Sequence, residues 1–355
     1  MKKLLLGMST ADLKLLAKEL GEKEFRGKQV ADWLYRPGCR EISGMANLRA
    51  DFRERLEEGY ETGRSKVKKA VIAGDGTFKL LLKPAFGELV EAVGIPYPDR
   101  FSCCVSTQIG CPVGCVFCAT GASGFKRNLA AGEIVDQVLS VGEYARSKTL
   151  LEVDGRVSHV VFMGMGEPLL NYDATLTAVR LINGEFNMGM RNITLSTIGY
   201  VPGIYRLAKE NIQLTLAVSL HASDDALRRK LVPGMTRYSL QEIVDACKNY
   251  FRETKRRLTF EYCLLKDVND GQADAARLAS MLQGLSCHVN VIPFNSFKGG
   301  GFHASEAARI ASFCRVLEEA DIAITRREQR GEGIEAACGQ LRRQALPDQG
   351  DLRIK

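Results

Sequence analysis

Residues 108–121, QIGCPVGCVFCATG, contain three closely spaced cysteines, Cys111, Cys115 and Cys118. Their spacing, with three and then two intervening residues, allows one loop to surround a compact inorganic centre with three thiolates, and glycines supply the tight turns. A structural zinc site takes four ligands, and so does an ordinary [4Fe–4S] cluster. Three thiolates would leave one iron of such a cluster open to a substrate. A zinc clip, or three thiols without a metal, are the alternatives.

The composition is that of an ordinary folded protein, with 355 residues, 45% hydrophobic and 26% charged. The first residues hold two lysines and a short apolar run, but Gly7, Ser9 and Asp12 interrupt it well before the roughly 20 residues that a membrane span needs. Eleven cysteines, an odd number in a chain without an export signal, predict reduced thiols and a cytoplasmic protein with no membrane partner. The net charge of +7 weakly favours a polyanionic partner.

The chain begins with a segment of helical period and continues with one of β period. Ser9 and Asp12 form a helix N-capping signal, and a second helix is predicted over 27–36. Residues 1–62 therefore predict a small helical accessory domain. Its mixture of aromatic and cationic side chains suits either RNA docking or a small core with a charged rim: Phe25, Arg26, Lys28, Trp33, Tyr35 and Arg36. Residues 63–100 hold two β-rich runs on either side of GDG and a third run after PAFGE, which predicts a meander leading into the main domain.

Residues 101–341 alternate short apolar runs with amphipathic stretches such as 131–147 and 270–284. This alternation predicts an α/β fold with a parallel sheet, either open and doubly wound or curved as a partial barrel. Polar and glycine-rich groups follow the strands, at the edge where α/β folds bind ligands. Residues 342–355 form a C-terminal tail. The predicted strands cover residues 101–107, 158–164, 192–199, 214–220, 257–265 and 287–294.

The cysteine loop resembles that of the radical S-adenosylmethionine (SAM) enzymes. CPVGCVFC, residues 111–118, has their CxxxCxxC spacing and the aromatic residue, Phe117, just before the last cysteine. In that superfamily SAM chelates the unique iron of a [4Fe–4S] cluster through its amino and carboxylate groups. The resemblance thus implies that the open position belongs to SAM, with Cys111, Cys115 and Cys118 holding the cluster.

An ordered set of further motifs resembles the RlmN/Cfr family of RNA adenine methyltransferases, from FRGKQVADWLY near the start to AACGQL near the end. The family implies a partial (βα)6 barrel of the TIM type, a small N-terminal helical domain and SAM at the barrel mouth. The motifs are CATGASGFKRNLAAGEIVDQV (118–138), FMGMGEPLLNY (162–172), STIGYVPGI (196–204), SLHAS (219–223), DVNDG (267–271) and VIPFNSF (291–297).

The same match assigns residues that contact SAM, and their chemistry suits the task. Glycine allows close backbone approach, while hydroxyl, carboxylate and amide groups bind the ribose and the amino-acid part. A dinucleotide fingerprint starting at GMG is disfavoured because Leu169 stands where its third glycine belongs. The assigned residues are Gly166, Glu167, Ser196, Ser219, Leu220, His221 and Asn295.

The resemblance also assigns two more cysteines and a carboxylate. Cys338, in RGEGIEAACGQL, matches the cysteine that takes a methyl group from one SAM, before a second SAM supplies the radical that activates it. Cys104 matches the cysteine that releases the product through a transient disulfide with Cys338, and Glu91 matches the proton acceptor. Cys103 adjoins Cys104, and we choose Cys104 because it is seven residues before Cys111. Neighbouring residues of a strand face opposite sides, so Cys103 is predicted to point into packing.

The function implied is methylation of carbon-2 of adenosine in large-subunit ribosomal RNA and, in some members, tRNA, with a flavodoxin-type electron donor. The alternatives are a carbon-8 methyltransferase of the Cfr type, a radical SAM enzyme for small molecules, and a zinc-binding RNA-binding protein without enzymatic activity. Basic stretches at 64–69, 227–230, 254–257 and 325–330 are either phosphate contacts or solvated faces. The remaining cysteines are predicted to be structural: Cys39, Cys247, Cys263, Cys287 and Cys314.

Overall fold

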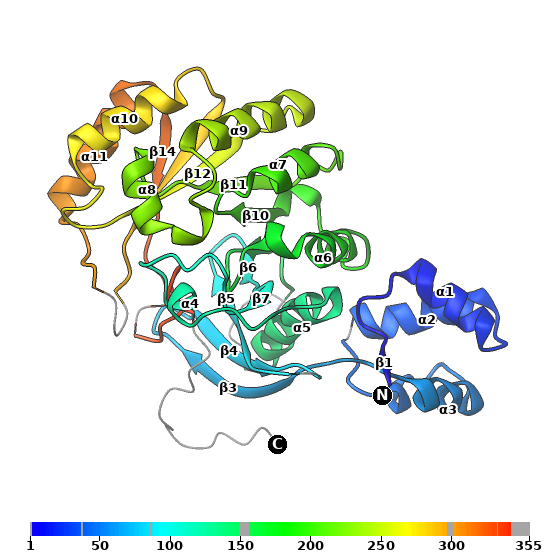
Figure 1. Cartoon of the computed structure of the whole chain (residues 1–355). Coiled ribbons are helices and arrows are strands. Elements are labelled where there is room, and N and C mark those ends of the chain that lie inside the picture. Colours follow the sequence, from blue (N-terminus) through cyan, green and yellow to red (C-terminus); the bar gives the residue numbers. More distant parts are fainter. Residues whose placement is uncertain are drawn as a thin grey trace.

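The computed structural model describes residues 2–36, 38–85, 87–148, 156–296, 301–331 and 333–341. Figure 1 shows a body made of one large sheet with helices along its outer side, and a smaller helical lobe that contains the N-terminus. The predicted tail, 342–355, lies outside the described residues. No described helix has both the length and the apolar composition that crossing a bilayer requires.

Seven strands of the body run parallel, and helices connect each one to the next. The sheet order begins at β14 and ends at β3, so the sheet stays open, and the predicted partial (βα)6 barrel is confirmed. The parallel strands are β6 (Phe101–Cys104), β9 (His159–Phe162), β10 (Ile193–Thr197), β11 (Thr215–Ser219), β12 (Leu258–Leu264), β13 (Cys287–Pro293) and β14 (Ala323–Arg326). The helices are α5 (Ala131–Ser147), α6 (Tyr172–Gly184), α7 (Val201–Ala208), α8 (Asp225–Leu231), α9 (Leu240–Thr254), α10 (Gln272–Leu282) and α11 (Ala307–Glu319).

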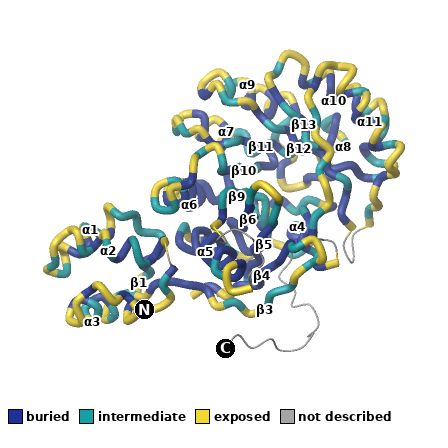
Figure 2. The backbone as a smooth tube through the Cα atoms, turned by 180° about the vertical axis from the view of Figure 1, so that it is seen from behind, coloured by how far each residue is buried: buried dark blue, intermediate teal, exposed yellow. Residues whose placement is uncertain are grey.

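The apolar runs of the sequence form the core between the sheet and these helices. Figure 2 shows buried backbone along the central strands and exposed backbone on the outer turns of the helices. Helix α9 illustrates the pattern, because Ser239 and Glu242 cap its first turn reciprocally while its inner face buries Ile243 and Tyr250. The core fixes the strands, and their carboxyl ends share one edge of the sheet.

The predicted meander is present and continues the same sheet. Strands β3 (Lys66–Ile72), β4 (Phe78–Lys83) and β5 (Val90–Pro96) are antiparallel, and β5 pairs with β6. The GDG turn joins β3 to β4, with Gly76 at a φ of 79° that glycine adopts without strain. Residues of the meander therefore share a surface with β6 and its two cysteines.

The N-terminal lobe consists of α1 (Thr10–Glu19), α2 (Glu24–Tyr35) and α3 (Ala50–Gly59), with β1 (Lys3–Leu4) paired to β2 (Tyr60–Glu61). The predicted cap is confirmed, because Asp12 Oδ2 accepts a hydrogen bond from Ser9 N at 2.8 Å and Ser9 Oγ accepts one from Asp12 N at 3.2 Å. Short elements complete the fold: β7 (Gln108–Ile109), α4 (Ala119–Ala122), β8 (Arg127–Asn128), η1 (Ile42–Gly44), η2 (Pro168–Asn171), η3 (Met190–Asn192) and η4 (Pro233–Met235).

Of the seven parallel strands, β14 was not predicted. Three of its four residues are exposed, so it lacks the apolar run by which a buried strand is recognised. The predicted strands 101–107 and 158–164 end earlier, at Cys104 and Phe162, because the residues beyond them turn into the loops at the mouth of the barrel.

Candidate active site

The turns that follow the parallel strands surround a cavity of about 170 Å³, which we call the cysteine-loop cavity. Leu220 does not line this cavity; it is fully buried, and its backbone oxygen accepts a hydrogen bond from Arg228. The cavity brings together predicted residues that are far apart in the sequence. They are Cys111, Cys115, Cys118, Gly166, Glu167, Ser196, Ser219, His221 and Cys338.

The three-cysteine loop lies between β7 and α4 and folds tightly on itself. Cys118 N donates a hydrogen bond of 3.1 Å to Cys115 O, and a Cβ atom on Gly121 would lie 2.7 Å from the same oxygen, so only glycine fits there. Burial raises the pKa of the Cys111 thiol to about 12. A metal centre that replaces the thiol protons would offset this cost of ionisation.

Among the described residues, no group of three His, Cys, Asp or Glu side chains could hold a single metal ion. A [4Fe–4S] cluster has a different requirement, because each thiolate binds its own iron atom.

Glu167 links the turns after β9 and β10. Its carboxylate accepts hydrogen bonds from Leu169 N at 2.9 Å, Thr197 Oγ1 at 2.8 Å and Ile198 N at 2.7 Å. Burial raises the pKa of Glu167 to about 7, although the three hydrogen bonds act in the opposite direction and lower it. A carboxylate has about four lone-pair positions, so one remains for a ligand in the cavity.

His221 is held as a neutral ring. Its Nδ1 accepts a hydrogen bond of 3.0 Å from Cys263 N, so the ring proton lies on Nε2. Burial, and then the nearby Arg228, lower the pKa of His221 to about 3. The backbone has a φ of 59°, and the ring packs edge-on against Phe117 of the cysteine loop at 4.8 Å between centroids. The ring can therefore donate, but not accept, one further hydrogen bond.

A second, smaller cavity of about 40 Å³ lies on the other side of Cys338, and we call it the Cys104 cavity. Cys104, Tyr97 and Asn295 line it, and Asn295, although predicted to contact SAM, does not line the cysteine-loop cavity. Met163, Ile292, Arg327 and Cys338 line both cavities, so Cys338 lies where the two cavities meet. Cys104 and Cys338 are both free thiols in this structure.

Hydrogen bonds to its backbone hold the segment that carries Cys338. Ala119 N, from α4 beside the cysteine loop, donates to Gly339 O at 2.7 Å, and Thr120 Oγ1 donates to Leu341 O at 2.5 Å. Asn295 Nδ2 donates to Cys338 O at 3.4 Å, while the buried Oδ1 of Asn295 has no protein partner. The same elements that shape the cysteine loop thus position Cys338.

Adjacent cysteines of β6 face opposite sides of the sheet. Cys104 pairs with Val93 and lines the Cys104 cavity, whereas Cys103 pairs with Gly94 and is fully buried. Burial, and then the neighbouring Cys338, raise the pKa of Cys104 to about 12, and the guanidinium of Arg327 acts in the opposite direction.

Glu91 lies on β5 and lines neither cavity. Its side chain is 1% exposed and forms an ion pair of 3.2 Å with Lys79 of β4. It is diagonal to Cys104 across the β5–β6 pairing, a relation that places Cα atoms about 7–8 Å apart.

Three residues at the site were not predicted. Arg327 follows β14 directly, and the nearby Cys338 sulfur, and then Glu261, raise its pKa above the usual value. Its position after a strand was the available signal, but β14 was not recognised. Cys263 lines the cysteine-loop cavity although it was predicted to be structural. Arg228, in the basic stretch 227–230, is 3% exposed and donates to the backbone oxygens of residues 198 and 220, so it does not face phosphates.

An open parallel barrel with a CxxxCxxC loop at its mouth defines the class of radical SAM enzymes. The Radical SAM superfamily matches residues 105–279, and a domain described as "Ribosomal RNA large subunit methyltransferase N-terminal domain" matches residues 4–61. This superfamily implies a [4Fe–4S] cluster and SAM. A radical SAM methyltransferase from Sphaerobacter thermophilus superposes with a TM-score of 0.91 at 43% identity, covering 96% of this chain and 99% of that one.

Curated relatives are similar over their whole length. "Probable dual-specificity RNA methyltransferase RlmN" of Synechococcus sp. is 45% identical over 98% of this chain and 98% of its own. The protein of the same name from Clostridium acetobutylicum is 44% identical over 97% and 98%. The chain belongs to the RlmN family of radical SAM enzymes, and the predicted family is confirmed.

Proposed function

We propose that this enzyme methylates carbon-2 of adenosine in large-subunit ribosomal RNA, with tRNA as a second substrate class. One observation carries the proposal: Cys338 lines both cavities. A methyl group acquired in the cysteine-loop cavity is thereby presented in the Cys104 cavity. The names of the relatives, and the ribosomal RNA domain matched at 4–61, support RNA as the substrate.

The residues of the cysteine-loop cavity fit the cluster and SAM. Cys111, Cys115 and Cys118 would hold three irons, leaving the fourth to SAM, and the free lone pair of Glu167 suits its amino group. Asn295 lines the neighbouring Cys104 cavity, and its orphaned Oδ1 remains a proposed acceptor for SAM. When bound, the cluster supplies an electron and SAM supplies both the methyl group and a 5′-deoxyadenosyl radical, so that one turnover uses two SAM molecules. Any electron donor, such as a flavodoxin, must reach this edge of the sheet.

Carbon-2 of adenine lies between two ring nitrogens and is electron-poor, so it does not attack the methyl group of SAM directly. Cys338 provides the nucleophile, because a thiolate displaces the methyl group from the sulfonium and holds it as a thioether. Loss of one hydrogen atom from this S-methyl group makes its carbon reactive towards the ring, and the methylene then links the protein to RNA.

Release of the product requires a proton acceptor and a second thiol. Glu91 takes the proton from carbon-2, and the electron pair of that C–H bond stays with the ring. The Cys104 thiolate attacks the Cys338 sulfur, the carbon–sulfur bond breaks, and a disulfide forms between the two cysteines. The released methylene takes a proton to become the methyl group. The adduct gives up one electron, which replaces the electron that the cluster would supply at the start, and the external electron donor later supplies the two electrons that reduce the disulfide.

RNA binding must widen the Cys104 cavity. Its 40 Å³ leaves room for only a few water molecules, which is less than a purine needs. The segment around Cys338 is the wall that we expect to shift, since it lines the cavity and is joined to Glu91 through Lys79. Extracting a stacked base costs a few kcal/mol, which contacts to the surrounding strand offset.

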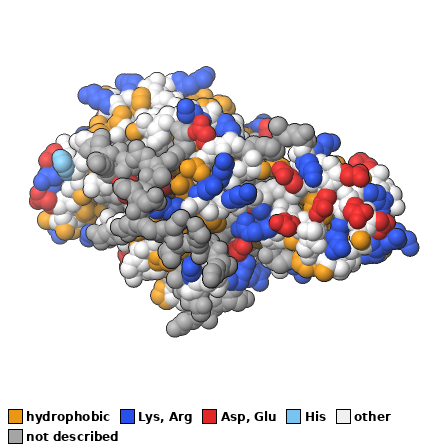
Figure 3. Space-filling view, turned by 90° about the horizontal axis from the view of Figure 1, so that it is seen from below, with side chains coloured by type: hydrophobic (Ala, Val, Ile, Leu, Met, Phe, Trp, Pro, Cys, Tyr) orange, Lys and Arg blue, Asp and Glu red, His pale blue; other side chains and the backbone are white. Residues whose placement is uncertain are grey.

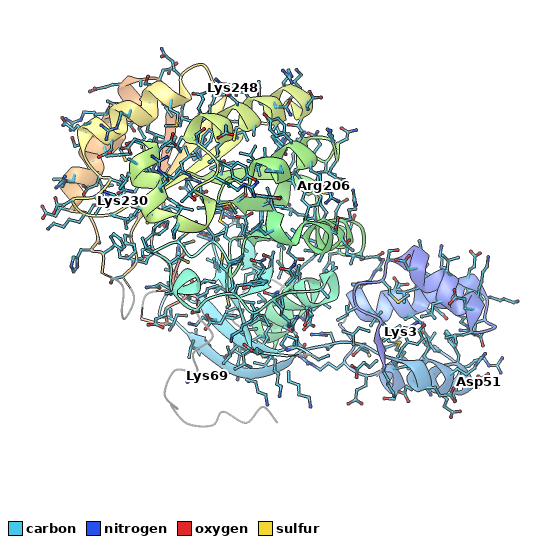
Figure 4. All side chains as sticks on the ribbon, in the orientation of Figure 1. Lys3, Asp51, Lys69, Arg206, Lys230 and Lys248 are labelled. Atoms are coloured by element: carbon cyan, nitrogen blue, oxygen red, sulfur yellow. The ribbon has the colours of Figure 1, made fainter. Side chains whose placement is uncertain are left out.

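Cationic residues of β3 are the best-placed phosphate contacts. Figure 3 shows Lys and Arg side chains gathered on the face seen from below, and a groove beside the N-terminal lobe is lined by Lys2, Lys66 and Lys68 together with Glu57 and Glu61. In Figure 4, Lys69 on β3 and Lys230 on α8 lie on separate parts of the surface. Phosphate contacts at β3 would weaken with rising salt.

The test is an anaerobic reaction of the cluster-loaded enzyme with ribosomal RNA fragments and labelled SAM, followed by nucleoside analysis. We expect 2-methyladenosine. A product that is 8-methyladenosine would assign the enzyme to the carbon-8 alternative. A colourless protein with zinc and without iron would support the non-enzymatic RNA-binding alternative.

A further inference from the structure

A buried lysine contacts both the proposed proton acceptor and the segment that carries the proposed methyl carrier. Lys79 Nζ lies 3.2 Å from Glu91 Oε1 and donates a hydrogen bond of 3.0 Å to the backbone oxygen of Glu335. The Lys79 side chain is only 5% exposed. Cys338 follows Glu335 by three residues, so one ammonium group connects β5 with the turn that precedes Cys338.

The register of the sheet explains why these groups meet. Lys79 pairs with Val93, and Val93 pairs with Cys104, so Lys79 and Cys104 project from the same face in one cross-strand row. Glu91 stands two residues before Val93 and projects from that face as well. Neighbouring strands are about 4.8 Å apart, so the ammonium, the carboxylate and the thiol share one small surface.

The turn that Lys79 contacts has a conformation that its surroundings must maintain. Glu335 is a non-glycine residue with a φ of 49°, in the left-handed region. Such a backbone persists only where neighbouring contacts hold it. The hydrogen bond from Lys79 to the oxygen of this residue is one of those contacts, and it acts close to Cys338.

We propose that Lys79 is a positioning residue for methyl transfer. The inference rests on the proposed function, in which Glu91 accepts the proton and Cys338 carries the methyl group. The ammonium favours the ionised carboxylate of Glu91, which is the form able to accept a proton. Its second hydrogen bond fixes the turn before Cys338. One side chain thus sets the acceptor and the carrier relative to each other.

A double-mutant cycle on the full-length, cluster-loaded enzyme tests this role. Lys79→Met, Glu91→Gln and the double variant are compared in single turnover for the rate of 2-methyladenosine formation and for the fraction of Cys338 that carries a methyl group. We expect each single variant to slow the product by about tenfold or more. In the double variant Lys79→Met should cost much less than it does alone, because the part of its effect that acts through Glu91 is already lost. Methylation of Cys338, which precedes proton transfer, should not change.

Two further variants control for charge and for the substitution itself. Lys79→Arg keeps the charge and should recover part of the rate. Lys248→Met removes a half-exposed lysine from a surface ion pair of 3.5 Å with Asp245, at the position labelled in Figure 4, and should match the unmodified enzyme. Should Lys79→Met not fold, Lys79→Gln, which keeps a donor for Glu335 O without the charge, replaces it in the cycle.

An unchanged rate of product formation in Lys79→Met would overturn the proposal, and so would effects of the two substitutions that multiply in the double variant. A parallel loss of product, Cys338 methylation and melting temperature in Lys79→Met would also overturn it, because that pattern indicates a purely structural ion pair. An unchanged rate in Glu91→Gln would instead contradict the proposed proton acceptor, and with it this part of the proposed function.

Discussion

The two cavities that meet at Cys338 are built differently. In the cysteine-loop cavity the polar groups are held by the protein itself, as the three hydrogen bonds to Glu167 and the neutral ring of His221 illustrate. The Cys104 cavity is about a quarter of its size, with 40 Å³ against 170 Å³. Arg327 lines both cavities, whereas Glu328 and Arg330 line only the Cys104 cavity.

This difference indicates a division of work. A preformed, internally satisfied cavity suits a cofactor that must be held in one orientation. A narrow cavity with charged neighbours suits steps in which thiols ionise and a proton moves, because nearby charges control both. In the proposed function Cys338 serves both sides, and its segment moves when RNA binds.

The largest effect should come from the cysteine-loop cavity. Cys115→Ala removes one of the three thiolates, and we expect the protein to lose its cluster iron and product formation to fall by more than about 10³-fold. Iron content, the visible spectrum and the single-turnover rate measure this. Cys247→Ala is the matched control, because Cys247 is buried in α9 and lines neither cavity. Full iron content in Cys115→Ala would contradict the assignment of this cavity.

On the Cys104 side, Arg327→Met should slow release of the product by about tenfold, the effect of one pKa unit. The guanidinium lowers the pKa of Cys104, which burial has raised to about 12, so its removal leaves less thiolate at neutral pH. The lifetime of the covalent protein–RNA adduct on denaturing gels measures this step. Arg327→Lys keeps the charge, and the lifetime of its adduct should lie between those of the unmodified enzyme and Arg327→Met. Equal lifetimes in all three proteins would exclude a role for Arg327.

A smaller effect is expected at the junction between the cavities. Asn295→Ala removes the 3.4 Å hydrogen bond to Cys338 O and the buried Oδ1 that has no protein partner. A neutral hydrogen bond contributes about 1 kcal/mol. The Kd for SAM should therefore rise, and the rate of Cys338 methylation should fall, each by roughly fivefold. Unchanged values would mean that Asn295 contacts neither SAM nor the carrier in the working enzyme.

The smallest effect is expected on the face of β6 that turns away from both cavities. Cys103→Ala should keep the product rate within about twofold and lower the free energy of unfolding by about 1 kcal/mol. Cys104→Ala should instead accumulate the protein–RNA adduct. If Cys103→Ala accumulated the adduct, the two cysteines would have to exchange roles.

Local sequence motifs predicted the cysteine-loop cavity far better than the Cys104 cavity. The spacing of Cys111, Cys115 and Cys118, and the glycine-rich turns after β9 and β10, are short-range signals that place ligands at a known edge of the fold. The open barrel followed from regular alternation of strands and helices, and the capping pair Ser9–Asp12 from its spacing.

The Cys104 side depends on contacts that have no local pattern. Lys79 meets Glu335 across 256 residues of sequence, through the register of three strands and the path of the C-terminal segment. Arg327 was taken for part of an exposed basic stretch because β14 has no apolar run. Such residues are indistinguishable from solvated lysines and arginines until the fold places them.

Cys338 is the proposed methyl carrier between the two cavities, and isotope tracing tests this role directly. Enzyme charged with trideuteromethyl SAM, freed of excess and then given unlabelled SAM and RNA, should transfer the label in its first turnover. The account predicts a methyl group with two deuteriums in the product and the third in 5′-deoxyadenosine, because the carrier loses one hydrogen before it bonds to the ring. An unlabelled product, or one that keeps all three deuteriums, would contradict it.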